Sequence, residues 1–277
     1  YGEAFAGILG RQADEVWVVA PFAAWVDDAT VADPRQIAAA VQGPPCHYWD
    51  GPLEALAGAV LSAADGTPEV VAVIGAGDVA RVVPDLVRQS RDEAWRTIEA
   101  ALDAVGVPHD RSRTWAELTT LGVGLGQPLR VLPETEAQLA AALRLAAAEG
   151  LPVWTLGAGS KLVGTDEEPL RLVVALSAGA FMAVEVGGED VTAGVGVCLS
   201  PLIRSLAERG RCDLGMVPLA WIPASLGGAL RTNAGAQGSA IGDFVLEVRG
   251  LRLDGSPWRA AGSDIVWSYR HSSLPED

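Results

Sequence analysis

Two glycine-rich stretches carry the residue types best suited to hold a phosphate-containing ligand. The first, residues 155–166, follows a short apolar stretch that is expected to form a strand. Glycine permits unusual φ values and close approach, so backbone N–H groups can converge there on phosphate oxygens. Lys161, the only lysine of the chain, supplies a positive charge, and Ser160 supplies a hydroxyl. Phosphate binding and a simple tight turn are both open, because short Gly-x-Gly strings are common.

The second stretch, residues 222–238, consists mainly of small side chains around one polar centre. That centre is Asn233, the only asparagine of the chain. A surface of small residues lets backbone amides and a flat ring system approach closely, as a dinucleotide cofactor requires. The alternative is a structural helix packed closely through glycine and alanine. The pattern alone does not decide between the two.

A third candidate is the pair Tyr269 and Arg270, near the end of the sequence. The guanidinium group of Arg270 is a planar and permanently charged donor that suits a carboxylate or a developing enolate. Tyr269 adds a phenol. An isolated pair of this kind is usually a surface feature, so its meaning depends on the other two stretches.

Composition limits the classes of protein to consider. A chain of 277 residues with 49% hydrophobic content can bury a core in each of two domains. The net charge of −15 argues against a nucleic-acid partner, which would need surplus Lys and Arg. No apolar stretch is long enough to span a bilayer, and the first residues do not resemble a signal peptide. We therefore expect a cytoplasmic protein without membrane insertion.

The cysteines and histidines are not spaced for a metal site. There are three of each, they are scattered, and no CxxC or HExxH pattern occurs. We expect buried thiols and structural or surface histidines, and no bound metal. The residues concerned are Cys46, Cys198, Cys212, His47, His109 and His271.

The first ninety residues alternate helix and strand signals, which favours a Rossmann-like parallel α/β domain. Strands are expected at residues 15–20 and 70–74. Helices are expected up to Gly10 and then from Pro34, Pro52 and Asp78. The charged stretch 88–113, with a helix at 92–105, is the expected junction, and residues 91–114 are the expected linker and helix.

The second half is expected to be mixed α+β, with glycine-rich loops between short strands. Thr135 and Gln138 predict a capping box at the start of a helix that Gly150 and Pro152 end. Strands are expected at 153–156, 172–176, 183–186, 191–193 and 245–253, and a further helix at 201–210.

In combination, the three candidate segments resemble UDP-N-acetylenolpyruvoylglucosamine reductases. That family's pattern resembles Leu-Gly-x-Gly-Ser-Asn, then Ile-Pro-Gly-x-x-Gly-Gly with Asn-Ala-Gly-Ala, then Tyr-Arg-x-Ser. Similar segments occur here in that order, and Thr119 and Thr120 are similar to the family's opening Thr-rich strand. The resemblance covers about residues 115–277. It implies an FAD-binding domain of the vanillyl-alcohol-oxidase/PCMH type.

The resemblance also implies roles for individual residues. FAD would be held by Gly157, Ala158, Gly159, Ser160, Lys161, Leu162, Pro223, Ala224, Ser225, Gly227, Gly228, Asn233, Gly235 and Ala236. Arg270 would be catalytic, because it would steady the enolpyruvyl carboxylate and the enolate, and Tyr269 and Gln237 would lie at the substrate. The implied reaction uses FAD and NADPH to reduce the enolpyruvyl group of a UDP-sugar during peptidoglycan synthesis.

Three positions depart from the family pattern. Lys161 replaces an asparagine, Ala224 a glycine and Gln237 a tyrosine. If position 224 required a positive φ, alanine there would cost roughly 1 kcal/mol. The family also draws its proton donor from a later third region, for which no match occurs in the sequence. We therefore expect slow turnover, or none, by this chain alone.

The first ninety residues resemble the third domain of UDP-N-acetylmuramate:L-alanine ligase, without the start of that domain. The resemblance lies in residues 1–9, 16–24, 50–61 and 73–78. It implies a fusion of a ligase-like segment with a reductase. No Gly-Lys-Ser/Thr P-loop occurs, so ATP-dependent ligation by this chain is not expected.

Two other functions stay open beside a working reductase. One is a non-catalytic FAD-binding fragment, and the other is an oxidase of the same flavin fold acting on another small substrate. The departures at Lys161 and Gln237 keep the oxidase open. The oligomeric state cannot be inferred from the sequence.

Overall fold

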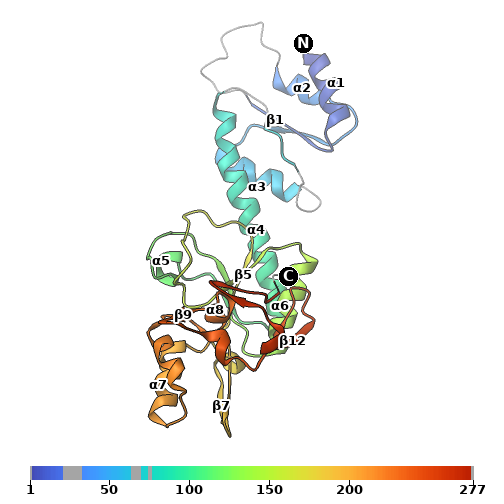
Figure 1. The fold of residues 1–277 in the computed structure, drawn as a ribbon. Helices are drawn as coiled ribbons and strands as arrows, with labels where there is room; N and C mark the ends of the chain where they lie inside the picture. The colour runs from blue at the N-terminus through green and yellow to red at the C-terminus, as the bar shows by residue number, and fades with distance from the viewer. Residues whose placement is uncertain (1, 21–32, 64–69, 74–76, 276–277) are drawn as a thin grey trace. The chain divides into compact units, whose positions relative to one another are not determined.

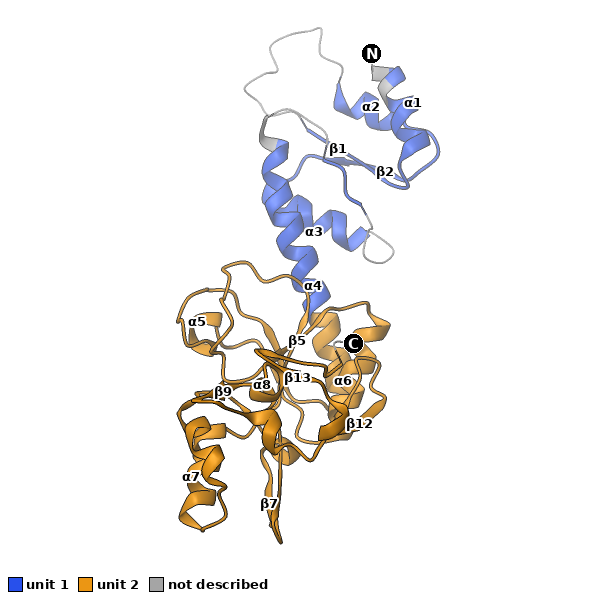
Figure 2. Ribbon diagram, viewed as in Figure 1, with its two compact units in different colours: residues 1–95 blue, residues 96–277 orange. Residues whose placement is uncertain are grey.

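The computed structural model describes residues 2–20, 33–63, 70–73 and 77–275. The chain divides into two compact units, Tyr1–Trp95 and Arg96–Asp277 (Figure 2). The division falls inside helix α4 (Val82–Ala104). We describe each unit by itself.

Unit 1 is built around two parallel strands. Strands β1 (Val16–Val19, labelled in Figure 1) and β2 (Cys46–Trp49, labelled in Figure 2) run parallel to each other. Val16 pairs with Cys46. Helix α2 (Pro34–Ala40) lies between them in sequence, so the unit contains the expected parallel α/β arrangement. The other elements in the described residues of this unit are α1 (Gly2–Gln12), α3 (Leu53–Ala63), η2 (Gly77–Arg81) and the first part of α4.

The core of unit 1 lies between its helices and the strand pair. Leu56 and Ala57 of α3 are buried with Val82 and Leu86 of α4. The side chain of Asp33 caps α2 by accepting a hydrogen bond from the amide of Arg35, and Pro34 opens the helix where no amide donor is needed.

Sequence reasoning placed some elements of unit 1 incorrectly. Strand β2 was not expected, because its four residues lack a clear alternation. Residues 70–73 of the expected strand 70–74 form no strand, and Ile74 lies outside the described residues. Parts of two ligase-like segments, residues 21–24 and 74–76, also lie outside the described residues. The helix expected from Asp92 begins at Val82, since Pro84 falls in the first turn, where a helix tolerates proline.

Unit 2 contains a four-stranded sheet in the order β3-β4-β6-β5. Strands β4 (Leu129–Val131) and β5 (Val153–Leu156) both run parallel to β6 (Leu172–Ala175), and β3 (His109–Asp110) is antiparallel to β4. All four residues of β6 are buried, which is typical of a central parallel strand. Part of the expected linker 91–114 is therefore a strand of this sheet.

Helix α6 (Glu136–Ala148) connects β4 to β5 and begins as expected. The Thr135 hydroxyl accepts a hydrogen bond from the Gln138 amide at 3.2 Å. The Gln138 side chain reaches one residue further back than in a standard capping box and accepts from the Glu134 amide at 2.8 Å. Gly150, with φ +62°, follows the helix end.

The rest of unit 2 consists of short helices and antiparallel hairpins, which confirms the expected mixed α+β class. The helices are α5 (Trp115–Leu118), α7 (Leu199–Glu208), α8 (Leu226–Arg231), η3 (Gly179–Met182), η4 (Leu214–Trp221), η5 (Ile241–Phe244) and η6 (Gly262–Asp264). The hairpins are β7 (Val184–Gly187) with β8 (Asp190–Ala193), β9 (Gly235–Ala236) with β10 (Ser239–Ala240), β11 (Glu247–Leu251) with β12 (Pro257–Ala261), and β13 (Trp267–Ser268) with β14 (His271–Ser272).

A compact apolar cluster fixes α8 in this unit. Leu199 and Ile203 of α7, Leu219 of η4, and Ala229 and Leu230 of α8 are all buried in it. Full burial of a leucine or isoleucine side chain stabilises by roughly 1.5–3 kcal/mol. The second glycine-rich stretch is therefore anchored by the core on one side.

Candidate cofactor-binding site

The two glycine-rich stretches meet where β5 ends and α8 begins. A Cβ atom built on Gly157 would lie 2.5 Å from Oγ of Ser225, closer than any side chain can stand. Ser225 is buried and is the N-cap of α8, where its Oγ accepts a hydrogen bond from the Gly228 amide at 3.3 Å. The absence of a side chain at Gly157 is what allows this contact.

The first stretch contains backbone donors for which the described residues supply no acceptor. No described residue accepts a hydrogen bond from the amides of residues 158–161. Gly159 has φ +68°, and its carbonyl accepts a hydrogen bond from the Thr120 amide at 3.1 Å. Lys161 is exposed and forms no ion pair with any described residue. Amides without an acceptor in the described part of the chain, next to an exposed cation, suit a phosphate or another anion.

The first turn of α8 is different, because its amides are already engaged. The amides of Leu226 and Gly227 donate to the carbonyls of Val197 and Val195, both at 2.8 Å, and the Gly228 amide donates to Ser225. What this stretch can offer a ring system is its small-residue surface rather than hydrogen-bond donors. Amide donors for a pyrophosphate must come from residues 158–161.

Ala224 carries no backbone strain. It is absent from the described non-glycine residues with positive φ, so the cost considered for alanine at this position does not arise. The Ala224 carbonyl accepts a hydrogen bond from the Leu199 amide at 2.9 Å, which ties the segment containing Pro223 to α7.

Three non-glycine residues in the described part of the chain have positive φ, and all three were predicted as site residues. They are Asn233 (φ 40°), Gln237 (φ 51°) and Arg270 (φ 59°). Such a backbone costs about 1–2 kcal/mol for a residue with a side chain, and persists only where the surroundings hold it. Strained residues concentrate at functional sites, so Gln237 and Arg270 stay candidates for a site.

Gln237 lies with Gly238 in the two-residue turn between β9 and β10. Both residues have positive φ, as a type I′ turn requires. Gly235 and Ala236 form β9 just before it, and a Cβ on Gly235 would lie 2.7 Å from the Ser239 carbonyl oxygen. Gln237, which replaces the family's tyrosine, therefore lies at a turn position that requires positive φ.

Tyr269 and Arg270 are the two residues between β13 and β14. Tyr269 is 90% exposed as a residue, and the Arg270 guanidinium carbon lies 5.6 Å from the centroid of the Tyr269 ring. Asn233 joins this turn to the second glycine-rich stretch, because its Nδ2 donates to the Ser268 carbonyl at 3.1 Å. The turn is therefore tied to the second stretch, whose α8 in turn contacts Gly157 through Ser225.

A buried polar cluster beneath the first stretch was missed by sequence reasoning. The Trp115 indole donates to the carboxylate of Glu168 at 2.5 Å, and Nε of Arg171 lies 2.9 Å from the other carboxylate oxygen. The guanidinium of Arg171 also stacks on the ring of Trp154, 3.8 Å from its centroid. Trp115 and Glu168 are 53 residues apart, so no local pattern marks the contact.

This cluster supports the loop directly. A Cβ on Gly164 would lie 2.1 Å from Cβ of Trp115, so the backbone of the loop rests against the indole-bearing residue. Trp115 is also buried with Leu156 and Val173 in a small core beneath the end of β5. The position of α5 therefore sets the position of the glycine-rich loop.

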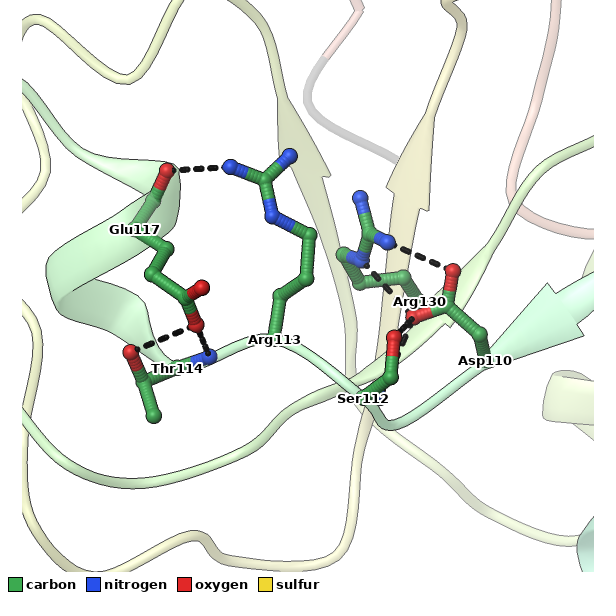
Figure 3. A network of polar contacts seen from close by, with 6 residues as sticks. All are labelled: Asp110, Ser112, Arg113, Thr114, Glu117 and Arg130. Carbon is green, nitrogen blue, oxygen red and sulfur yellow. Dashed lines mark hydrogen bonds and ion pairs between the residues drawn. The ribbon is translucent and has the colours of Figure 1, made fainter.

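A polar network fixes the segment that leads into α5 (Figure 3). Arg130 binds Asp110 through Nη2 at 2.5 Å and Nε at 3.2 Å. The amide and hydroxyl of Thr114 donate to the Glu117 carboxylate at 2.8 and 3.0 Å. Partial burial raises the pKa of Asp110, but hydrogen bonds from Arg130 and Ser112 outweigh it and lower the pKa from its ordinary value.

Known proteins define the class of this region. Residues 128–261 match the family model described as an FAD binding domain, and this span contains both glycine-rich stretches. The expected FAD-binding fold is thereby confirmed. The Tyr269–Arg270 turn lies just beyond the matched residues.

Several individual proteins similar to this chain are UDP-N-acetylenolpyruvoylglucosamine reductases, the family that the motifs resemble. The chain is 39% identical over 165 residues to a UDP-N-acetylenolpyruvoylglucosamine reductase of Paracoccus denitrificans, covering 60% of this chain and 52% of the relative. It is 35% identical over 188 residues to a reductase of the same name from Methylorubrum extorquens, covering 65% of this chain and 60% of that relative. The crystal structure of the Thermus caldophilus reductase gives a TM-score of 0.51 at 29% identity, covering 61% of this chain and 58% of that one.

The extent of these matches limits what they establish. The chain spans about half to three fifths of the length of these relatives. The resemblance to the reductases is confirmed for the FAD-binding part, and the ligase-like resemblance of the first segment stays a prediction. Within the described residues, no helix combines the length and apolarity needed to cross a membrane. The same residues contain no group of three or more His, Cys, Asp or Glu arranged to hold a metal.

Proposed function

We propose that this chain binds FAD between its two glycine-rich stretches and belongs to an enzyme that reduces UDP-N-acetylenolpyruvoylglucosamine. The observation that supports it best is the meeting of Gly157 with Ser225 next to the unused amides of residues 158–161. The names of the relatives supply the substrate, and the matched family model supplies the cofactor.

The residues present fit the cofactor's charge and shape. A pyrophosphate is a compact anion, and the four amides of residues 158–161 can donate to it while Lys161 compensates its charge. In a chain of net charge −15, an anion needs such a locally placed cation. The small residues Gly227, Gly228, Gly235 and Ala236 are the proposed contact surface for the flat ring system.

The chemistry divides between the cofactor and the protein. Bound FAD supplies hydride transfer, which no side chain can perform. Arg270 binds the carboxylate of the enolpyruvyl group and stabilises negative charge as the double bond is reduced. Tyr269 and Gln237 contact the sugar nucleotide. NADPH is the proposed source of the hydride.

The proposed function also includes a pathway, a cellular compartment and a domain division. The reaction serves peptidoglycan synthesis in the cytoplasm, where NADPH and UDP-sugars are available. Residues 1–90 form a ligase-like domain fused to the reductase, residues 91–114 the connection, and residues 115–277 the FAD-binding domain.

Flavin absorbance of the purified chain tests the proposal. We expect FAD to bind with a characteristic visible spectrum and NADPH to bleach it without oxygen. Lys161→Gln should weaken FAD binding about tenfold, because one charge-assisted hydrogen bond contributes about 1.5–3 kcal/mol. The matched control is Arg209→Gln, which removes one exposed charge at the end of α7. Absence of FAD binding would contradict the proposal, and bleaching by a sugar but not by NADPH would favour an oxidase.

A further inference from the structure

The Tyr269–Arg270 turn is held in a strained conformation. Arg270 has φ +59° in a two-residue connection, at a position that usually takes glycine or asparagine. Without restraint, an arginine would leave this conformation readily, because the left-handed region costs about 1–2 kcal/mol. Something must therefore hold the turn.

The C-terminal end of α8 supplies the restraints. The Ser272 hydroxyl, 2% exposed as a residue, donates to the Arg231 carbonyl at 3.1 Å. The Arg231 guanidinium donates to the Leu274 carbonyl at 2.7 Å. On the other side of the turn, Asn233 donates from Nδ2 to the Ser268 carbonyl at 3.1 Å. The turn is thus tied on both strands to the end of one helix.

Asn233 is itself placed by a complete helix-ending motif. The Ala234 amide donates to the Ala229 carbonyl at 2.8 Å, and the Asn233 amide donates to the Leu230 carbonyl at 3.2 Å. These are the two hydrogen bonds of a Schellman motif, in which the residue after the C-cap adopts positive φ. Ala229 and Ala234 are both buried in the core cluster, so the position of Asn233 is rigid.

The side chain of Asn233 makes two different hydrogen bonds at once. Its Oδ1 accepts from the Gly242 amide at 3.0 Å while its Nδ2 donates to Ser268. Aspartate has no donor for the second bond, serine has only one polar atom, and most other residues tolerate positive φ poorly. The position therefore selects asparagine by its own chemistry, with no ligand needed to explain it.

From this we propose that Asn233 is a positioning residue that sets the Tyr269–Arg270 turn relative to the small-residue stretch, rather than a ligand of the cofactor. The consequence for substrate binding rests on the proposed function, because it requires that Arg270 contact the sugar nucleotide. The restraint on the turn does not depend on that function.

Two substitutions of Asn233 test the two hydrogen bonds of its side chain. Asn233→Asp retains an acceptor for Gly242 and tolerance of positive φ, but places a carboxylate oxygen against the Ser268 carbonyl. Asn233→Gly tolerates the backbone and removes both bonds. The control is Asp254→Ala, which removes a side-chain hydrogen bond to the Ser256 amide in the separate β11–β12 hairpin.

Hydrogen exchange and ligand affinity are then measured on the whole 277-residue chain. In both Asn233 variants we expect amide exchange in residues 266–273 to rise about fivefold to tenfold, as for loss of one hydrogen bond that contributes about 1 kcal/mol. Affinity for UDP-N-acetylenolpyruvoylglucosamine, followed by the flavin spectrum, should fall about tenfold while FAD affinity stays within about twofold. The control should change neither.

Two results would overturn the proposal. One is unchanged exchange in residues 266–273 in both variants. The other is a loss of FAD affinity as large as the loss of sugar-nucleotide affinity, which would make Asn233 a cofactor ligand. If the wild-type chain binds no FAD, the proposed function fails, yet the exchange comparison still decides whether Asn233 holds the turn.

Discussion

At the scale of single residues, the candidate site depends on positions where a side chain is missing or a backbone is strained. Gly157 lets β5 approach α8, and Asn233, Gln237 and Arg270 adopt positive φ without being glycine. Sequence analysis selected Gly157, Asn233 and Arg270 from local signals and Gln237 from the family resemblance. The cofactor role predicted for Asn233 stays untested, and the positioning role that we propose instead rests on its side-chain bonds to the backbone of Gly242 and Ser268.

Gly157→Ala tests the contact between the two stretches. The added methyl would lie 2.5 Å from Ser225 Oγ, so Ser225 must move and its cap on α8 is disturbed. Overpacking of this kind costs about 1–3 kcal/mol, and we expect FAD affinity to fall about tenfold. Isothermal titration of FAD measures the change.

A glycine in open space provides the control for this substitution. No atom lies within 4 Å of a Cβ built on Gly187 in β7, so Gly187→Ala should leave FAD affinity unchanged. Adding Ser225→Ala to Gly157→Ala should recover part of the affinity, because the clashing oxygen is gone. Equal effects of Gly157→Ala and Gly187→Ala would argue against a site at this contact.

At the scale of elements, α5 and its neighbours decide where the first glycine-rich stretch lies. The buried pair Glu168 and Arg171 joins Trp115 of α5 to Trp154 of β5. Breaking a buried ion pair by removing one charge costs about 3–5 kcal/mol, because the other charge stays buried without compensation. Glu168 thus supports the loop without being part of it.

Glu168→Gln is expected to lower the free energy of unfolding by about 3 kcal/mol and to increase hydrogen exchange in residues 157–166. The control is Glu247→Gln, which breaks the exposed pair with Arg259 at 2.8 Å and should cost no more than about 1 kcal/mol. Urea denaturation measures both. A similar decrease in the free energy of unfolding in both variants would show that the buried cluster stabilises the protein no more than the exposed ion pair does.

The network before α5 gives an expected pH dependence. The pKa of Asp110 is lowered in the folded protein, since hydrogen bonds from Arg130 and Ser112 outweigh its partial burial. A lowered carboxyl pKa contributes stability that is present above the unfolded value, about 3.9, and is lost as pH falls through the folded value.

Asp110→Asn removes this titration and should make the protein less stable than the wild type at pH 7. The difference should shrink below about pH 4, where the wild-type carboxyl becomes protonated. Thermal unfolding midpoints between pH 3 and pH 7 follow it. A difference that stays constant over this range would show that the charge of Asp110 contributes nothing.

At the scale of the whole molecule, the chain consists of two compact units that meet within the sequence of α4. Each unit has its own buried cluster, Leu56 with Leu86 in the first and Leu199 with Leu219 in the second. Separate cores favour separate unfolding, because each unit buries its own apolar side chains.

We therefore predict two thermal transitions, of which only one responds to FAD. A ligand at 100 times its dissociation constant stabilises the unit that binds it by about 2.7 kcal/mol. The transition of residues 96–277 should rise in temperature and that of residues 1–95 should not, as measured by calorimetry with proteolysis to assign each step. A single transition that shifts as a whole would contradict two independent units.

The sequence by itself determined the local features of this protein. It predicted the capped start of α6, the glycine after its end, and strand β1 with the helices that flank it. These features depend on neighbouring residues, on backbone preferences and on hydrophobic period, all of which a single sequence contains. Short elements such as β2 and the β13–β14 hairpin escaped, because two to four residues show no period.

Only the tertiary structure decided which of those segments meet and which groups remain free. The contacts of Gly157 with Ser225, of Asn233 with Ser268, and of Trp115 with Glu168 join residues 35 or more positions apart. No local rule specifies such contacts, because they form only when the sheet and helices have packed together. In the folded structure, the amides at the start of α8 donate hydrogen bonds to other parts of the chain. The amides of residues 158–161 have no acceptor among the described residues. The first stretch is therefore the candidate phosphate site.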